Sequence, residues 1–132
     1  MITGIAHSCY IVKDLASSID FYQKLGLTPA FDFLHESGER FGVYLHAGGR
    51  NFIELFIDEP TEITGKPSYS HLCLEVDDIH TTVADLRAKG IEVSDPTMGC
   101  DNSWQAWVAD PDGNRIELHH YTPESWQTPW LR

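Results

Sequence analysis

Apolar and polar positions alternate with two different periods along the first part of the chain. Residues 2–12 are rich in β-branched and apolar side chains, which is typical of a strand. Asp14 follows at the position of a helix N-cap, and Gly26 stands where a helix would stop. The apolar side chains between them recur at helical spacing: Leu15, Ile19, Tyr22 and Leu25. The pattern therefore predicts a strand followed by a helix.

Three more strand-like segments follow this predicted helix. They cover about residues 29–35, 40–47 and 51–57, and the pairs Ser37-Gly38 and Gly48-Gly49 separate them. Such pairs are turn signals between strands. The first half of the chain is therefore predicted to have the order β-α-β-β-β.

The second half repeats the first. Residues 7–27 align with residues 71–91, and residues 51–55 align with residues 114–118 at nearly the same shift. The repeat predicts a strand at about 69–76, a helix at 78–89, and strands at about 91–97, 103–109 and 114–121. Identical pairs in the alignment are His7 and His71, Cys9 and Cys73, Val12 and Val76, Asp14 and Asp78, and Gly26 and Gly90. The predicted fold class is α+β, with two tandem βαβββ modules.

The length of 132 residues matches one domain with its own core. We expect a single domain over residues 1–132, with module one at about 1–58 and module two at about 69–122. The segment 59–68 contains prolines and a glycine and is expected to be a linker. Residues 123–132 form a tail that is expected to pack without a regular element.

Two His and two Glu occupy equivalent places in the repeat. His7 and His71 fall on the first strand of their modules, and Glu54 and Glu117 fall on the last. A single His or Glu on a strand is ordinarily structural. Four in register with a repeat would converge if approximate two-fold symmetry relates the modules, and they would suit a divalent ion with room for water. The sequence therefore predicts a catalytic metal site.

The net charge of the chain limits the kinds of partner that it can bind. A net charge of −11, from 20 acidic and 9 basic residues, argues against a nucleic acid or an anionic membrane surface. No apolar run approaches the roughly 20 residues that a membrane span needs. The three cysteines, Cys9, Cys73 and Cys100, show no CxxC spacing. We expect a cytoplasmic protein with reduced thiols that binds a small-molecule substrate.

These motifs resemble the vicinal oxygen chelate superfamily, which includes glyoxalases, bleomycin resistance proteins and extradiol dioxygenases. The matching segments are Ser18-Ile19-Asp20-Phe21-Tyr22, Leu25-Gly26-Leu27 and Asp110-Pro111-Asp112-Gly113-Asn114. The quartet His7, Glu54, His71 and Glu117 is similar to the metal ligands of bacterial glyoxalase I. The resemblance implies curved, mostly antiparallel sheets around one divalent ion (Ni, Co, Zn, Mn or Fe). It also implies a homodimer with shared active sites, while a site within one chain remains an alternative.

The activity that this resemblance implies is that of an isomerase or lyase. Its substrate would be a small α-hydroxycarbonyl compound or its thiol adduct, converted through an enediolate. Glu117, or Glu54 by the symmetry of the site, would shuttle the proton. The alternatives are a non-catalytic, resistance-type binding protein and an extradiol-type dioxygenase.

The sequence departs from glyoxalase I at two substrate positions. Ile11 and Asp58 stand where glyoxalase I enzymes typically carry an Arg and an Asn that contact glutathione. We therefore expect weak activity on the hemithioacetal of glutathione, unless Arg40, Arg50 or Arg115 supplies the missing cation.

Other side chains are placed by strand alternation. Cys9 and Cys73 share a face with the two candidate histidines, and Arg115 and His119 share the face of Glu117. The aromatic residues Phe33, Tyr44, Trp104 and Trp107 are as consistent with a pocket wall as with ordinary core packing.

Overall fold

The computed structural model describes residues 5–57, 69 and 71–131. The chain divides into two compact units, Met1–Lys66 and Pro67–Arg132. The boundary between them falls inside the segment predicted as a linker. Each unit corresponds to one copy of the sequence repeat.

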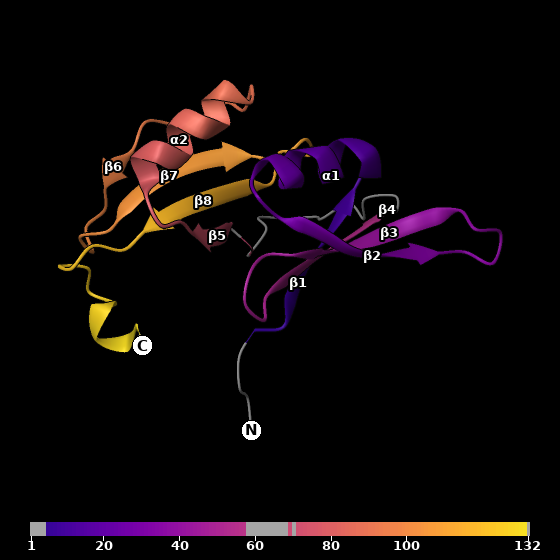
Figure 1. Cartoon of the computed structure of the whole chain (residues 1–132), viewed down its shortest axis with the longest axis horizontal. Helices are drawn as coiled ribbons and strands as arrows, with labels where there is room; N and C mark the ends of the chain where they lie inside the picture. Colours follow the sequence, from indigo (N-terminus) through magenta and orange to yellow (C-terminus); the bar gives the residue numbers. More distant parts are fainter. Residues whose placement is uncertain (1–4, 58–68, 70, 132) are drawn as a thin grey trace. The chain divides into compact units, whose positions relative to one another are not determined.

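Unit one contains one helix and one four-stranded sheet. Its elements are β1 (His7–Val12), α1 (Leu15–Lys24), β2 (Thr28–Leu34), β3 (Arg40–His46) and β4 (Phe52–Ile57). The strand order is β1-β4-β3-β2, with β1 parallel to β4 and the other neighbours antiparallel (Figure 1). The predicted βαβββ order is confirmed.

Unit two repeats this topology. Its elements are β5 (Leu72–Glu75), α2 (Ile79–Ala88), β6 (Thr97–Met98), β7 (Trp104–Ala109) and β8 (Arg115–His120). The order β5-β8-β7-β6, with β5 parallel to β8, matches that of unit one. The prediction of an α+β fold with two βαβββ modules is therefore correct. The tail contains a short 3₁₀ helix, Thr128–Trp130, that the sequence did not predict.

The two helices begin at equivalent aspartates, as predicted. The Asp14 carboxylate accepts a hydrogen bond from the Ser17 backbone N–H at 3.2 Å, and the Asp78 carboxylate accepts one from Thr81 at 2.7 Å. Both bonds satisfy backbone donors that have no partner within the first turn. Each helix ends before a glycine with positive φ, Gly26 and Gly90.

Strand alternation separates a buried face from an open face in each sheet. On β1, Tyr10 and Val12 are buried, whereas His7, Cys9 and Ile11 are exposed. The buried side chains form the core with the helix of the same unit, and each fully buried Leu, Ile or Val contributes about 1.5–3 kcal/mol. We call the side of each sheet that carries the exposed set its open face. The candidate histidine of β1 lies on it.

The predicted strand at 91–97 is wrong over most of its length, because β6 has only two residues. Pro96 lacks the backbone N–H that a strand would offer its neighbour. At Ser94, the hydroxyl rather than the carbonyl accepts the Trp107 N–H, at 2.8 Å. The residues of this segment favour a strand, but the absent N–H of Pro96 and the hydrogen bond to the Ser94 hydroxyl interrupt the regular backbone ladder.

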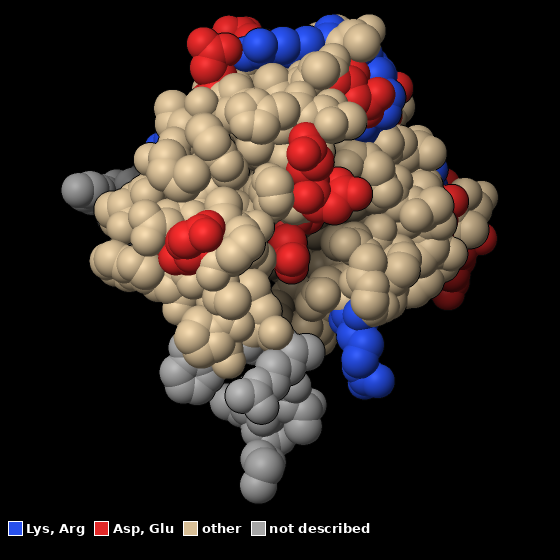
Figure 2. All heavy atoms as spheres, turned by 60° about the vertical axis from the view of Figure 1, so that its left-hand side comes forward, with Lys and Arg blue, Asp and Glu red and all other residues tan. Residues whose placement is uncertain are grey.

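On the face that Figure 2 shows, acidic side chains lie in the middle as well as at the edge, whereas basic side chains lie at the edge. Most of the basic groups there lie beside acidic ones, so no continuous basic tract covers this face. Within the described residues, no helix is long and apolar enough to cross a bilayer.

Candidate metal centre

The candidate ligands of unit one come from neighbouring parallel strands. β1 carries His7 and β4 carries Glu54, and both side chains lie on the open face. Imidazole Nε2 of His7 is 3.4 Å from carboxylate Oε2 of Glu54. Two of the four predicted ligands, His7 and Glu54, are therefore neighbours within unit one.

Unit two forms the equivalent pair. His71 directly precedes β5, and Glu117 lies on the parallel neighbour β8. The Nε2 atom of His71 is 3.0 Å from Oε2 of Glu117. Both side chains are partly buried, with 31% of His71 and 12% of Glu117 exposed.

The spacing within each pair matches two adjacent ligands of one metal ion. With metal–ligand bonds of about 2.1 Å, adjacent donor atoms lie about 3.0 Å apart in an octahedral site and about 3.4 Å apart in a tetrahedral one. The two pairs measure 3.4 and 3.0 Å, distances that a direct His–Glu ion pair or hydrogen bond also gives. Imidazole nitrogen with carboxylate oxygen also suits a borderline divalent ion such as Zn, Ni, Co, Fe or Mn. The residues present therefore fit the ion that the sequence predicts.

The two pairs differ in the aromatic residue that supports each histidine. Tyr44 on β3 faces Glu54 across the sheet, and its hydroxyl lies 3.0 Å from Nδ1 of His7. The corresponding residue in unit two is Trp107, which faces Glu117 and packs edge-on against His71. Tyr44 was predicted only as pocket wall or core. Its contact with a candidate ligand could not be read from the sequence.

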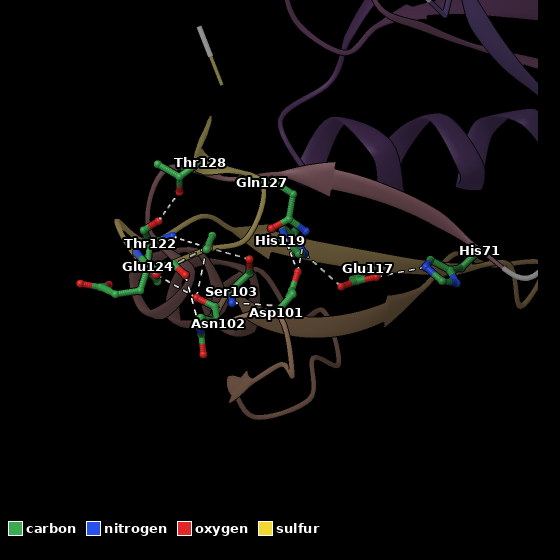
Figure 3. A network of polar contacts seen from close by, with 11 residues as sticks. His71, Asp101, Asn102, Ser103, Glu117, His119, Thr122, Glu124, Gln127 and Thr128 are labelled. Carbon is green, nitrogen blue, oxygen red and sulfur yellow. Dashed lines mark hydrogen bonds and ion pairs between the residues drawn. The ribbon is translucent and has the colours of Figure 1, made fainter. Parts of the chain in front are cut away.

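The carboxylate of Glu117 has a second imidazole partner, which Figure 3 shows. Nδ1 of His119 lies 3.1 Å from Oε1 of Glu117, as expected from their shared face. On its other side, Nε2 of His119 lies 3.8 Å from Oδ2 of Asp101. Gln127 of the tail donates to the same Asp101 oxygen at 2.6 Å. No pattern in the sequence pointed to Asp101 or Gln127.

The two cysteines that follow the candidate histidines lie beside the glutamates. Cys9 pairs in register with Glu54, and Cys73 pairs with Glu117. Loss of hydration and then the Glu117 carboxylate raise the pKa of the Cys73 thiol to about 12. The pKa of Cys9 is raised for the same reasons, with Glu54 as the carboxylate. The expectation that both thiols share the face of the histidines is confirmed.

Donor atoms of Cys73, Glu117 and His119 lie within 4.8 Å of one another. This group shares Glu117 with the pair formed by His71, so both belong to one region of unit two. Imidazole nitrogen and carboxylate oxygen are metal ligands, whereas cysteine binds a metal as the thiolate, which the raised pKa of Cys73 disfavours.

The other aromatic candidates divide between the two faces. On the open face, Phe33 lies 6.4 Å from Tyr44 between ring centroids. Trp104 instead packs against His80 of α2 and so belongs to the helix side. The open face of unit one can therefore supply Phe33 and Tyr44 to a substrate, and that of unit two can supply Trp107 but not Trp104.

A hollow of about 560 Å³ opens next to Tyr44 in unit one. Its lining residues are Ile5, Ala6, Tyr44, Gly49, Arg50, Asn51 and Phe52. Because Tyr44 contacts His7, the hollow adjoins the candidate metal ligands of this unit.

The arginines differ in their availability to a substrate. Arg40 forms an ion pair with Asp32 at 3.3 Å, and the Arg115 guanidinium lies 4.3 Å from the ring centre of Trp107. Arg50 lines the hollow. Ile11 is 44% exposed on the open face, whereas Asp58 lies outside the described residues. Position 11 therefore lies on the same face as the candidate ligand His7 and offers no positive charge there.

The family model of the Glyoxalase/Bleomycin resistance protein/Dioxygenase superfamily matches residues 4–118. The chain belongs to this superfamily. The resemblance inferred from the motifs is thereby confirmed. Its members include lactoylglutathione lyases as well as non-catalytic resistance proteins, commonly bind a divalent metal and small molecules, and often form dimers.

A curated relative is the glyoxalase domain-containing protein RDO1 of Mycosarcoma maydis. The two are 28% identical in an alignment 131 positions long, and the match covers 91% of this chain and 69% of the relative. The match extends over most of both proteins.

Solved structures with the same fold include both enzymes and binding proteins. TnmS3, an antibiotic binding protein from Streptomyces sp. CB03234, has a TM-score of 0.75 and 28% identity, with coverage of 92% of this chain and 98% of that one. Lactoylglutathione lyase from Agrobacterium tumefaciens has a TM-score of 0.69 and 21% identity, with coverage of 95% and 97%. FosX from Listeria monocytogenes, solved with Mn(II) and sulfate, has a TM-score of 0.70 and 19% identity, with coverage of 95% and 98%.

Proposed function

We propose that this protein is a metal-dependent isomerase or lyase of the glyoxalase I type. Its substrate is a small α-hydroxycarbonyl compound or the thiol adduct of one. The observation that carries the proposal is the His–Glu pair in each unit, with donor atoms 3.4 and 3.0 Å apart. The two pairs stand at equivalent positions of the repeat, which a common role as metal ligands would explain.

All four residues, His7, Glu54, His71 and Glu117, hold one divalent ion in this proposal. The two pairs come from one chain or, in a homodimer, from two. When bound, the ion would polarise the neighbouring oxygens of the substrate and so stabilise an enediolate, which is worth several kcal/mol.

The protein's own groups then move the proton. A glutamate carboxylate removes the hydrogen from the carbon that bears the hydroxyl group and returns it to the neighbouring carbon, so that no net proton is lost. Glu117 and Glu54 are the candidates for this step, which typically contributes about 10²–10⁴ in rate. The aromatic rings of the open face, Phe33 and Tyr44 among them, would exclude water from the carbanion.

Stoichiometry tests the shared site. Protein purified without chelator should contain one Mn, Co, Ni, Zn or Fe ion per chain. Replacement of either His7 or His71 with Ala should abolish tight binding, because each removes a ligand of the same ion. Two independent ions per chain, each lost with only one of the two substitutions, would contradict the shared site.

Substitution of Glu117 tests the catalytic step. Glu117→Gln removes the carboxylate that is both a ligand and a proton carrier, while the amide retains its size. We expect loss of turnover with an unchanged circular dichroism spectrum. The activity should be measured as a screen across 2-oxoaldehydes, their thiol adducts and hydroxy-keto acids, with each metal in turn. Full activity of the variant would exclude the role assigned to Glu117.

A second candidate function is non-catalytic binding of a small molecule. The similarity to TnmS3, which binds an antibiotic, favours it. The two candidates differ in their dependence on metal. If the purified protein contains no divalent ion and binds none more tightly than about 1 mM, binding without catalysis becomes the better account.

A further inference from the structure

The carboxylate of Glu117 is held from two sides by imidazole rings. Oε2 faces Nε2 of His71 at 3.0 Å, and Oε1 faces Nδ1 of His119 at 3.1 Å. A carboxylate can only accept hydrogen bonds, so Nδ1 of His119 carries the hydrogen in this contact. The side chain of His119 is only 12% exposed. Its ring is therefore fixed by packing as well as by the hydrogen bond.

Unit one has no such support at the equivalent strand position. In the repeat, the residue two positions after the glutamate is His119 in unit two and Phe56 in unit one. The carboxylate of Glu54 contacts His7 at 3.4 Å and lies beside the Cys9 thiol. The two candidate ligand carboxylates are therefore restrained differently, although the repeat places them equivalently.

The support of Glu117 continues into the tail. Nε2 of His119 is buried without a hydrogen-bond partner among the described residues, and it lies 3.8 Å from the carboxylate of Asp101, which is beyond hydrogen-bond distance. The same carboxylate accepts hydrogen bonds from the Gln127 side chain at 2.6 Å and from the Ser103 backbone at 3.2 Å. The hydrogen bond from Gln127 is the largest cause that lowers the pKa of Asp101, so this group stays ionised. Figure 3 shows the continuous line from His71 through Glu117 to the tail.

The tail itself is fixed against the loop that carries Asp101. Trp126 donates its backbone N–H to the Asp101 carbonyl at 3.0 Å, and the hydroxyls of Ser103 and Ser125 lie 2.8 Å apart in a buried contact. Asn102, whose φ of 62° places it in the left-handed region, donates its side-chain amide to the Glu124 carbonyl at 3.2 Å. The loop and the tail therefore form one hydrogen-bonded structure.

We propose that His119 is a positioning residue that holds Glu117 in its metal-binding orientation through the Nδ1 hydrogen bond, and that Asp101, itself fixed by Gln127, limits the movement of the His119 ring on its other side. The expected effect on metal affinity rests on the proposed function, whereas the contacts of His119 are those of unit two itself. It makes residues 101–103 and 122–127, which contain none of the proposed ligands, part of the support of the metal site. It also makes Glu117 the more firmly held of the two carboxylates.

The test compares Co²⁺ binding by variants of the full chain. Hydrogen-bonded supports of metal ligands typically contribute about 10- to 100-fold in affinity. His119→Phe, which copies the residue of unit one, should weaken Co²⁺ binding by about that factor and change the visible absorption of bound Co²⁺. His119→Asn should recover most of the affinity, because its amide N–H can replace Nδ1. Gln127→Leu should give a smaller loss.

A matched control and a metal-free measurement complete the design. His46→Phe alters a histidine of unit one that contacts Phe52 and the Gly49 carbonyl, and it should leave the affinity unchanged. In the metal-free protein, long-range ¹H–¹⁵N spectra should show a protonated Nδ1 on His119 that shifts in Glu117→Gln.

The outcomes separate this inference from the proposed function. Wild-type Co²⁺ affinity and an unchanged spectrum in His119→Phe would overturn the inference and leave the metal function standing. Should wild-type protein bind no ion while the Nδ1 signal still responds to Glu117→Gln, the metal function fails and the contact between His119 and Glu117 stands. No response of that signal overturns the contact itself.

Discussion

The Tyr44 hydroxyl lies 3.0 Å from Nδ1 of His7, and Nε2 of the same ring points to Glu54 at 3.4 Å. The imidazole is thus oriented through one nitrogen while the other remains directed at a carboxylate. A histidine that binds a metal through Nε2 carries its hydrogen on Nδ1, and the Tyr44 oxygen is placed to accept it.

Tyr44→Phe should therefore weaken divalent metal binding by about 10-fold. The change removes one hydroxyl and leaves the ring, which stacks on Phe31 and Phe52, in place. The affinity can be measured by competition with a chromophoric chelator. Trp107→Phe is the matched control in unit two, because the rings of Trp107 and His71 pack in a T-shaped arrangement. An equal loss in the two variants would show that packing, and not the hydroxyl, orients His7.

Gly42 allows the Phe56 ring to lie directly over the β3 backbone. A Cβ atom at position 42 would overlap the Phe56 ring and would lie 2.9 Å from the Leu55 carbonyl oxygen. Gly42→Ala should destabilise the protein by about 1–3 kcal/mol, as overpacking usually does. The free energy of unfolding in urea measures it.

A double-mutant cycle with Phe56→Leu identifies the cause of that loss. The smaller side chain gives the new methyl group room, so the double variant should lose less than the sum of the single losses. Strict additivity would mean that the backbone contact with Leu55, and not the ring, makes Gly42 necessary.

Asp78 should make the stability of α2 depend on acid. Hydrogen bonds from Thr81 lower the pKa of Asp78 in the folded protein, so the capping contribution is complete above the ordinary value of about 4. It is lost as the pH falls through the lowered pKa, because a protonated carboxyl is the poorer acceptor. Thermal unfolding of the wild type and of Asp78→Ala should therefore differ at pH 7 and converge in strong acid.

Asp78→Asn and the equivalent Asp14 provide the controls. The amide can still accept the Thr81 N–H but does not titrate, so its difference from the wild type should also shrink in acid. Asp14→Ala should behave like Asp78→Ala, since Ser17 lowers the pKa of Asp14 in the same way. A gap that is independent of pH would show that the charge does not contribute.

The fold could be predicted from the sequence because the signals for its elements are local and occur twice. An aspartate cap, an apolar stripe and a glycine stop specify each helix, and the repeat supports each assignment with a second copy. The predicted strand at 91–97 is wrong because Pro96 has no N–H and the Ser94 hydroxyl accepts the Trp107 N–H in place of a carbonyl, although the Ser94 N–H still donates to the Trp107 carbonyl. The strand propensity of a sequence does not show that a side-chain hydroxyl will replace a backbone carbonyl as hydrogen-bond acceptor.

The site could be predicted only in part. His7 and Glu54, like His71 and Glu117, were found because the repeat marks positions on neighbouring strands. Asp101 and Gln127 were missed, because a loop and a tail that lie 26 residues apart meet only through tertiary packing. Whether the two pairs hold one ion remains a prediction.

The last prediction concerns glutathione. Ile11 lies on the same face as His7 and is 44% exposed, so the position where glyoxalase I enzymes carry an arginine is open and uncharged. Asp58 adds a negative charge in the sequence, which would repel a carboxylate by about 1 kcal/mol or more if partly desolvated. The net charge of −11 also gives an anionic tripeptide no long-range attraction. We expect low kcat/KM for the hemithioacetal of methylglyoxal and glutathione.

Ile11→Arg should raise that kcat/KM by about 10-fold, because it restores one charge contact to the peptide. Ile11→Met, which extends the side chain without a charge, should have no such effect. The hemithioacetal of mercaptoethanol lacks carboxylates, so neither variant should change its turnover.

Arg50, which lines the hollow beside Tyr44, offers a different route to the same recognition. If the metal-loaded wild type already reaches a kcat/KM near the diffusional ceiling of about 10⁸ M⁻¹s⁻¹ with the glutathione adduct, Ile11 and Asp58 do not limit the enzyme. In that case Arg50→Gln should lower the rate, because Arg50 would supply the cation from the hollow beside Tyr44.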